Sequence, residues 1–120
     1  MYRVPNDLNL DPIIGCSLVQ LCLGRSDVQL NFDDPAIRIH VESRITLLES
    51  SKVIATWNQS NCWSSIAFQK LLDATVIAIR VPNERTLEIE FDNNLVLQAH
   101  DDSDICESMQ IHSKDGTFIV

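Results

Sequence analysis

Four cysteines and three histidines are the side chains in this sequence best suited to nucleophilic or metal chemistry. The cysteines stand at positions 16, 22, 62 and 106, and no two of them have the C-x-x-C spacing of a zinc hairpin. An extended segment would separate Cys16 from Cys22 by roughly 20 Å, which is too far for a disulfide. Cysteine is among the most buried residue types, so we expect reduced thiols that pack as small apolar side chains.

The three histidines, His40, His100 and His112, fall in strand-like segments, where one of them could activate a cysteine or serine. Such a pair would make the chain a small Cys/His hydrolase. However, the sequence has no G-x-S-x-G turn, and three glycines cannot supply the usual phosphate-binding loop. We therefore interpret the histidines as surface residues. We expect a protein that is not an enzyme and needs no cofactor, with hydrolase activity as the last alternative.

Carboxylates are the most numerous charged groups of the chain. Seventeen Asp and Glu residues oppose nine Lys and Arg residues, which gives a net charge of -8. This charge repels nucleic acid and anionic membranes, and it suits a basic protein partner. The residues expected to form an acidic protein-binding face are Asp33, Asp34, Glu88, Glu90, Asp101, Asp102, Asp104 and Glu107.

Two groups of these carboxylates have a second interpretation. The run from Asp101 to Glu107 could suggest a calcium loop, but it lacks the glycine and the distal glutamate of an EF-hand, so we expect no metal. Glu88 and Glu90 are about 7 Å apart if they share one face of a strand, which is a spacing that a glycosidase pair could use. Outward strand positions commonly carry such neighbours, so this spacing does not indicate a glycosidase.

Two stretches of the chain, residues 13–43 and 71–102, repeat one pattern that would position these side chains. Each begins with an apolar pair and continues through three segments in which apolar residues recur at every second position. Because successive side chains of a strand point to opposite faces, this period is typical of half-buried antiparallel strands. The residues expected to face the core are Val19, Leu21, Leu23, Val28, Leu30, Phe32, Ile37, Ile39 and Val41 in the first unit, and Ile77, Ile79, Val81, Leu87, Ile89, Phe91, Leu95, Leu97 and Ala99 in the second.

The alternate positions of these strands are polar, and we expect them to face solvent. They are Gln29, Asn31, Arg38, His40 and Glu42 in the first unit, and Glu88, Glu90, Gln98 and His100 in the second. The turns are short and contain Gly, Pro, Asn and Asp, as hairpins require. The matching lead-in pairs and the Phe-Asp pair after each second strand favour an internal duplication.

The remaining segments predict smaller elements. Ile45 to Leu48 and Val53 to Trp57 indicate a hairpin, and a short helix from about Ser64 to Leu72, capped by Ser64 or Ser65, would follow. A last hairpin would turn at residues 114–116. We predict a mainly β (α+β) fold in a single domain, 1–120: two antiparallel three-stranded meanders packed as a sandwich or open barrel, one short helix between them and a C-terminal hairpin.

The chain has no apolar run of the roughly 20 residues that a membrane span needs. Its first twelve residues are polar and contain two prolines, so they do not resemble a signal peptide. We therefore expect a cytoplasmic protein.

The segments IIGCSLVQLCLGRSDVQLNFDD and LLDATVIAIRVPNERTLEIEFDNN resemble a family of small, uncharacterised bacterial β-domains. The residues that carry this resemblance are Gly15, Leu30, Phe32, Ile89, Phe91, Glu107 and Ser108. The chain departs from the family pattern at Asp34-Pro35 and Asn93-Asn94, which replace the turn glycine, at Asp73, which replaces the second lead-in glycine, and at Met109, which replaces a tryptophan. The motifs are structural, and they extend over most of the chain.

The resemblance implies an immunity-type protein, one that blocks a toxin encoded beside it. Together with the acidic charge, it leads us to expect a non-catalytic domain that occludes the active site of a basic toxin domain. The alternative is a structural or regulatory β module that forms a homodimer through an exposed edge strand.

Overall fold

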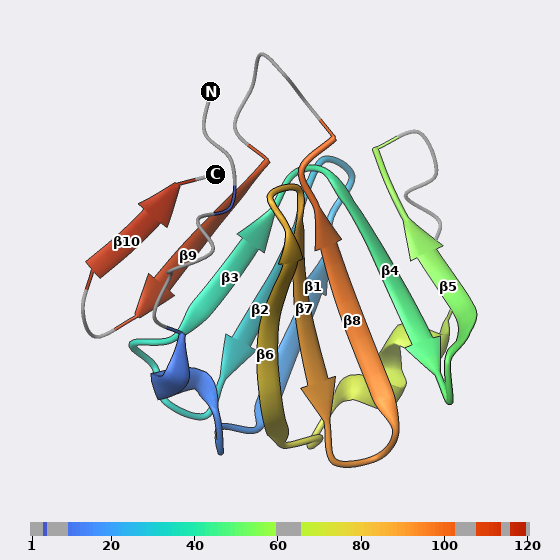
Figure 1. Cartoon of the computed structure of the whole chain (residues 1–120), viewed down its shortest axis with the longest axis horizontal. Helices are drawn as coiled ribbons and strands as arrows, with labels where there is room; N and C mark the ends of the chain where they lie inside the picture. The colour runs from blue at the N-terminus through green and yellow to red at the C-terminus, as the bar shows by residue number, and fades with distance from the viewer. Residues whose placement is uncertain (1–3, 5–9, 60–65, 103–107, 114–115, 120) are drawn as a thin grey trace.

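The structure is a computed structural model that describes residue 4 and residues 10–59, 66–102, 108–113 and 116–119. Two antiparallel five-stranded sheets pack face to face (Figure 1). The first sheet has the order β1-β2-β3-β9-β10, formed by Leu18–Leu23, Val28–Phe32, Arg38–Val41, Met109–Ser113 and Gly116–Ile119. The second has the order β5-β4-β8-β7-β6, formed by Lys52–Trp57, Arg44–Glu49, Leu95–His100, Thr86–Phe91 and Val76–Asn83. The predicted sandwich of two meanders is confirmed, and the sheets do not close into a barrel.

Each meander is followed by a hairpin that joins the opposite sheet. The hairpin β4–β5 follows the first meander but pairs through β4 with β8 of the second. The hairpin β9–β10 follows the second meander but pairs through β9 with β3 of the first. Each half of the chain therefore completes the sheet of the other half, so neither sheet can form from one half alone.

The two halves also meet along a short ladder that joins the starts of β1 and β6, which we call the seam (residues 15–18 and 73–76). Ser17 and Thr75 form an isolated antiparallel bridge, and their side-chain oxygens are 3.0 Å apart. Leu18 N–H donates to the carbonyl of Ala74, and Val76 N–H donates to the carbonyl of Cys16. These partners occupy matching places in the two repeats, so the seam has an approximate two-fold symmetry.

The core lies between the sheets and is built from matching positions of both meanders. Every core residue predicted for the second and third segments of each meander is at most 3% exposed, which confirms those predictions. The first strands differ, because Val19 is 53% exposed and Ile77 is 48% exposed. A register shift follows Leu18 in β1 and Val76 in β6, and these two residues take the core positions instead. A bulge adds one residue and so moves the side chains after it to the other face.

Leu21, Ile79 and Val81, which follow these bulges, pack against the core while remaining partly exposed. Leu23 is 41% exposed, so it does not belong to the core as predicted. Partial exposure of this kind follows from position, because β1 and β6 are edge strands of their sheets.

The short helix between the meanders is a 3-10 helix, η2 (Ile66–Leu71), and a second 3-10 helix, η1 (Asp11–Ile13), precedes β1. Phe68 and Leu71 of η2 are buried, whereas Ile66 is 77% exposed. The predicted short helix is therefore a 3-10 helix, whose repeat of three residues places Phe68 and Leu71 on one side. The predicted start and caps, Ser64 and Ser65, lie outside the described residues. The predicted central hairpin is confirmed, and it turns at Ser50 and Ser51, whose positive φ angles of 50° and 70° are those of a two-residue hairpin turn.

Candidate functional site

Glu88 and Glu90 lie on the outer face of the second sheet, where Arg80 holds both. Arg80 Nε donates to Glu88 and Nη2 donates to Glu90, each at 2.8 Å. Gln98 Nε2 donates to the other oxygen of Glu88 at 2.9 Å. The hydrogen bond from Gln98 lowers the pKa of Glu88, and the Arg80 guanidinium lowers it further. These two carboxylates therefore already have partners within their own sheet.

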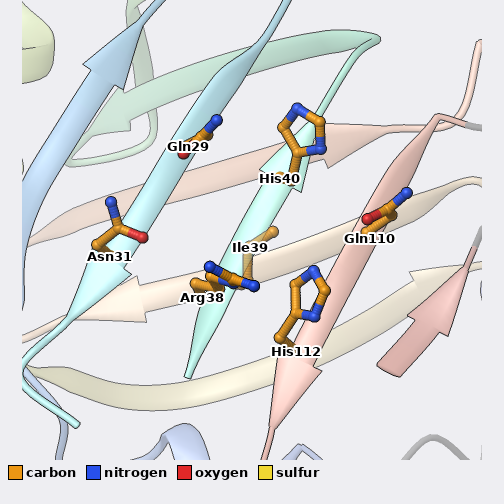
Figure 2. A pocket seen from close by; sticks show the side chains of 7 residues that line it. All are labelled: Gln29, Asn31, Arg38, Ile39, His40, Gln110 and His112. Carbon is orange, nitrogen blue, oxygen red and sulfur yellow. The ribbon is translucent and has the colours of Figure 1, made fainter. Parts of the chain in front are cut away.

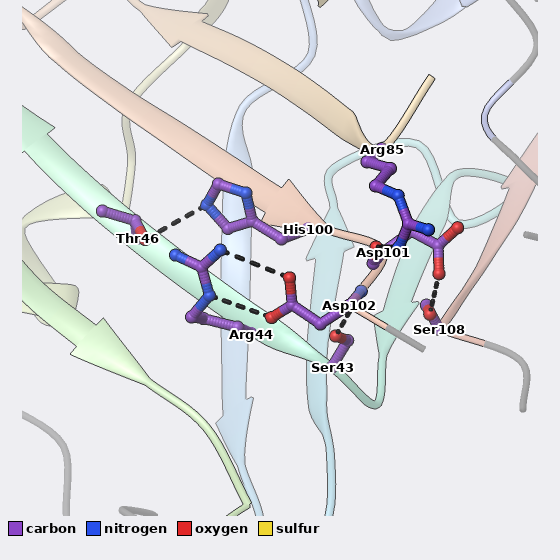
Figure 3. A network of polar contacts seen from close by, with 8 residues as sticks. All are labelled: Ser43, Arg44, Thr46, Arg85, His100, Asp101, Asp102 and Ser108. Carbon is purple, nitrogen blue, oxygen red and sulfur yellow. Dashed lines mark hydrogen bonds and ion pairs between the residues drawn. The ribbon is translucent and has the colours of Figure 1, made fainter. Parts of the chain in front are cut away.

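Asp101 is fully buried just after β8, where it ties neighbouring segments together (Figure 3). Ser108 Oγ donates to its carboxylate at 2.5 Å. Its backbone accepts a bond from Arg85 Nη1 at 3.1 Å and donates to the carbonyl of Arg85 at 2.7 Å. The carboxylate thus joins the end of β8 to Ser108, just before β9, and at 0% exposure it is not presented to a partner protein.

Asp102, the next residue, lies at the surface and forms a forked ion pair with Arg44, at 2.9 Å and 3.3 Å (Figure 3). The hydrogen bonds from Arg44 hold the pKa of Asp102 below its usual value. His100 lies beside this pair, within 3.2 Å of the Thr46 hydroxyl, and burial together with the charge of Arg44 lowers its pKa. Arg44, Thr46 and His100 are thus a paired polar network rather than an open reactive group.

The remaining acidic residues lie elsewhere. Asp33 and Asp34 belong to the β2–β3 turn, which lies at the opposite end of the sandwich from the end of β8, the strand that Asp102 follows (Figure 1). Both support the backbone: Asp33 Oδ1 accepts a bond from Ser17 N–H, and Asp34 Oδ1 accepts one from Ala36 N–H. Asp104 and Glu107 lie outside the described residues. The described members of the predicted acidic face are therefore distributed over two ends and one sheet face.

A different surface, which the sequence interpretation missed, gathers apolar and acidic side chains at the seam. Four of the seven exposed large apolar residues that the structure describes lie within three residues of the Ser17–Thr75 bridge. Exposed carboxylates flank them. We call this set the seam patch, and its members are Ile14, Val19, Leu72, Ile77, Asp33, Asp73 and Asp92. The matching Phe-Asp and lead-in positions of the two units were the signal in the sequence that could have indicated it.

The outer face of the first sheet carries a second feature, an open hollow of about 260 Å³ (Figure 2). It lies over β2, β3 and β9. Its lining is polar except for one isoleucine and consists of Gln29, Asn31, Arg38, Ile39, His40, Gln110 and His112. This surface was predicted to face solvent, but the pattern gave no sign that it is hollowed.

A metal ion has no assembled site among the residues that the structure describes. No group of three or more His, Cys, Asp or Glu residues in these segments is arranged to hold a metal ion. Cys16 and Cys22 are in no disulfide and are of intermediate exposure, so they are less buried than predicted. Cys62 and Cys106 lie outside the described residues. His40 and His112, which line the hollow, bond to Asp27 at 2.7 Å and to Thr117 at 3.0 Å.

Within the described segments, no helix has the length and apolar character needed to cross a membrane. Comparison of the chain with models of protein families, with curated proteins and with solved structures finds no match.

Proposed function

We propose that this protein is a non-catalytic binding domain that docks a basic partner protein on the seam patch. The observation that carries this proposal is the coincidence of exposed apolar side chains with exposed carboxylates at one symmetric place. In its more specific form the partner is a toxin domain, and the protein acts as its immunity protein.

The apolar part of the patch supplies the area that a partner would bury. Ile14, Val19, Leu72 and Ile77 are each between 44% and 53% exposed. Isolated apolar residues are normal on a protein surface, whereas a group of them with a polar rim is typical of an interaction site. The apolar side chains come in matched pairs across the two-fold of the seam, Ile14 with Leu72 and Val19 with Ile77.

The acidic part of the patch specifies the charge of the partner. Asp33 and Asp92 each accept a hydrogen bond at 3.1 Å from the backbone N–H of a seam residue, Ser17 and Thr75 respectively. This holds both carboxylates in place before binding, which lowers the entropy that binding would cost. Lys70, which precedes Leu72 closely in the chain, is paired with Glu49 at 3.3 Å and does not neutralise the patch. Lys and Arg side chains of a partner would form charge-assisted hydrogen bonds here.

The mechanism is occlusion. A toxin that acts on nucleic acid or another anionic substrate needs a basic active-site cleft, and an acidic domain seated on that cleft excludes the substrate. The net charge of -8 would also accelerate the encounter with a basic domain.

The test is a titration against the product of the adjacent gene, with the toxicity of that product measured in cells with and without this protein. We expect Asp33→Asn with Asp92→Asn to weaken binding about 10- to 100-fold, since it removes two charges but keeps the oxygens that accept the backbone bonds. Glu88→Gln with Glu90→Gln removes the same charge from the second sheet and should change affinity less than about 2-fold. A neighbour that is neither bound nor silenced would overturn the proposal.

Light scattering distinguishes the alternative occupant, a second copy of this chain. Val19→Thr with Ile77→Thr keeps branched side chains in the edge strands while making the patch polar. A wild-type dimer that these substitutions dissociate would assign the patch to self-association, and it would contradict a basic partner at this surface.

A further inference from the structure

The hollow on the first sheet is built from two parallel rows of side chains. Asn31, Arg38 and His112 are directly opposite one another on β2, β3 and β9 and form the first row. Gln29, His40 and Gln110 form the second row in the same way. Neighbouring strands lie about 4.8 Å apart and the two rows about 7 Å apart, so six polar side chains surround a space the size of a small ligand.

Arg38 is the charged group at the centre of the first row. Its guanidinium makes no hydrogen bond or ion pair with any residue that the structure describes, whereas Arg44 and Arg80 are each held by carboxylates. A guanidinium has its donors fixed in a planar fork that matches a carboxylate. An arginine of this kind above a hollow is free to bind an anion.

The neighbours of Arg38 in the row add donors. Asn31 Nδ2 already donates to Gln20 Oε1 at 3.1 Å, and His112 Nδ1 lies 3.0 Å from the Thr117 hydroxyl. These bonds orient the two side chains on either side of Arg38. They leave Nε2 of His112 without a partner among the described residues, so it can donate to a ligand.

The second row sets a limit on the charge of the ligand. His40 Nε2 lies 2.7 Å from Asp27 Oδ2, and its Nδ1 lies 4.0 Å from Glu42 Oε1. Gln29 Nε2 also donates to Asp27, at 3.3 Å. With carboxylates at this end and an acidic protein behind it, a doubly charged phosphate would be repelled more strongly than a singly charged group.

We propose that the hollow over β2, β3 and β9 binds a carboxylate group, which Arg38 holds in a two-pronged hydrogen bond and His112 contacts from the next strand (Figure 2). The carboxylate belongs either to a small free acid or to an acidic side chain of a bound peptide. The site lies on the outer face of the first sheet and does not use the seam patch. This proposal is therefore independent of the function proposed above.

The pKa of His112 supplies a spectroscopic probe of the site. Burial lowers this pKa, and the positive charges of Arg38 and His40 lower it further. Within the described segments, these two residues on β3 are the titratable and charged groups that face His112, and its neighbour on β10 is Thr117. A bound carboxylate would oppose their field and would raise the pKa of His112.

The experiment is an NMR titration of the full chain with acetate, a singly charged carboxylate, at constant ionic strength. We expect saturable shifts of the side-chain amides of Gln29, Asn31 and Gln110, a dissociation constant on the order of 1 mM, and a rise in the pKa of His112. Arg38→Gln should weaken binding at least 10-fold. Arg25→Gln is the matched control, since Arg25 is an exposed arginine of the β1–β2 turn, and it should weaken binding less than 2-fold.

Two further arms separate the sources of the carboxylate and test its chemistry. A capped peptide with one glutamate that binds at lower concentration than acetate assigns the site to acidic side chains, and the reverse order assigns it to a small acid. Inorganic phosphate that binds as tightly as acetate overturns the preference for a carboxylate. The proposal as a whole is overturned if neither carboxylate ligand shifts the lining residues, or if both arginine variants weaken binding equally.

Discussion

Arg38 and Arg80 lie on the outer faces of the two sheets of one sandwich, and their surroundings differ. Arg80 is clamped between Glu88 and Glu90 at 2.8 Å, and Gln98 continues the row. Arg38 stands between Asn31 and His112 over a hollow, without a carboxylate partner among the described residues. The second sheet thus satisfies its own charges, whereas the first sheet keeps a cation available.

The inward faces of the same strands do not differ in this way. Leu30 and Ile39 of the first sheet match Ile89 and Leu97 of the second, and all four are at most 1% exposed. Inward positions are fixed by the need to fill a shared core at high density, so they keep their apolar character in both halves. Packing does not restrict the outward positions, so their residues can differ between the two sheets. Binding specificity can therefore reside in these outward residues.

The largest expected effect tests whether the two halves are equivalent in the core. Phe32 and Phe91 occupy matching core positions, with exposures of 3% and 1%. Phe32→Ala and Phe91→Ala should each lower the free energy of unfolding by about 3–5 kcal/mol, because each leaves a cavity in the same core. Urea unfolding measures both values, with Val19→Ala and Ile77→Ala as exposed controls near zero. A difference of several kcal/mol between the two phenylalanines would contradict equivalence of the halves.

The next effect separates two adjacent carboxylates that sequence alone treats alike. Asp101→Ala should cost about 1–3 kcal/mol of folding free energy, because it leaves the buried hydroxyl of Ser108 without its acceptor. Asp102→Ala should cost less than about 1 kcal/mol, because its ion pair with Arg44 is exposed on both sides. Thermal unfolding distinguishes the two. Equal losses would mean that Asp101 does not have the structural role assigned to it.

The pattern of the sequence predicted the meanders because alternation is a local consequence of burying one face of a strand. The pattern placed Val19 and Ile77 in the core wrongly. A bulge after Leu18 and after Val76 reverses which side chains face the core, and the order of apolar residues in the sequence does not reveal a bulge. It could not predict that each hairpin joins the opposite sheet, because strand pairing between sheets depends on tertiary packing.

The candidate site was less predictable than the fold for a related reason. Composition gives the sign and the size of the charge, but pairing decides which charges remain available. Glu88 and Glu90 follow the outward period as predicted, yet a cation on the neighbouring strand occupies them. Arg38 follows the same period, and only the absence of a described carboxylate around it distinguishes it from Arg80.

A smaller effect tests whether Arg80 pairs with Glu88 on the outer face of the second sheet in solution. Because the folded pKa of Glu88 is lowered, its stabilising contribution is present at neutral pH and is lost as the pH falls below about 4.5 and through the folded pKa. Arg80→Gln should raise this pKa, though not fully, since the hydrogen bond from Gln98 remains. Carbon NMR of the side-chain carboxyl measures the change, and Arg25→Gln should leave it unchanged. A Glu88 pKa that does not respond would show that Arg80 does not hold this carboxylate in solution.

The smallest expected effect compares matching backbone positions of the seam. Gly15 and Asp73 hold equivalent places with φ angles of 91° and 70°, a region that favours glycine. A Cβ on Gly15 would meet no atom within 4 Å, so Gly15→Ala should cost about 1 kcal/mol through backbone strain alone. Asp73→Gly removes the backbone strain of an aspartate at a positive φ angle, and it should stabilise the fold by less than about 1 kcal/mol.

Asp73→Asn separates this backbone effect from the charge of the seam patch. Asparagine tolerates the left-handed region about as well as aspartate, so its effect on unfolding should be near zero. The two substitutions should differ in their effect on stability but not in their effect on binding. Asp73→Asn and Asp73→Gly should lower the affinity for a basic partner to the same extent, because both remove the same carboxylate. If Asp73→Gly destabilised the fold by as much as Gly15→Ala, the two sides of the seam would not share one backbone geometry, and the two-fold symmetry of the patch would have no energetic basis.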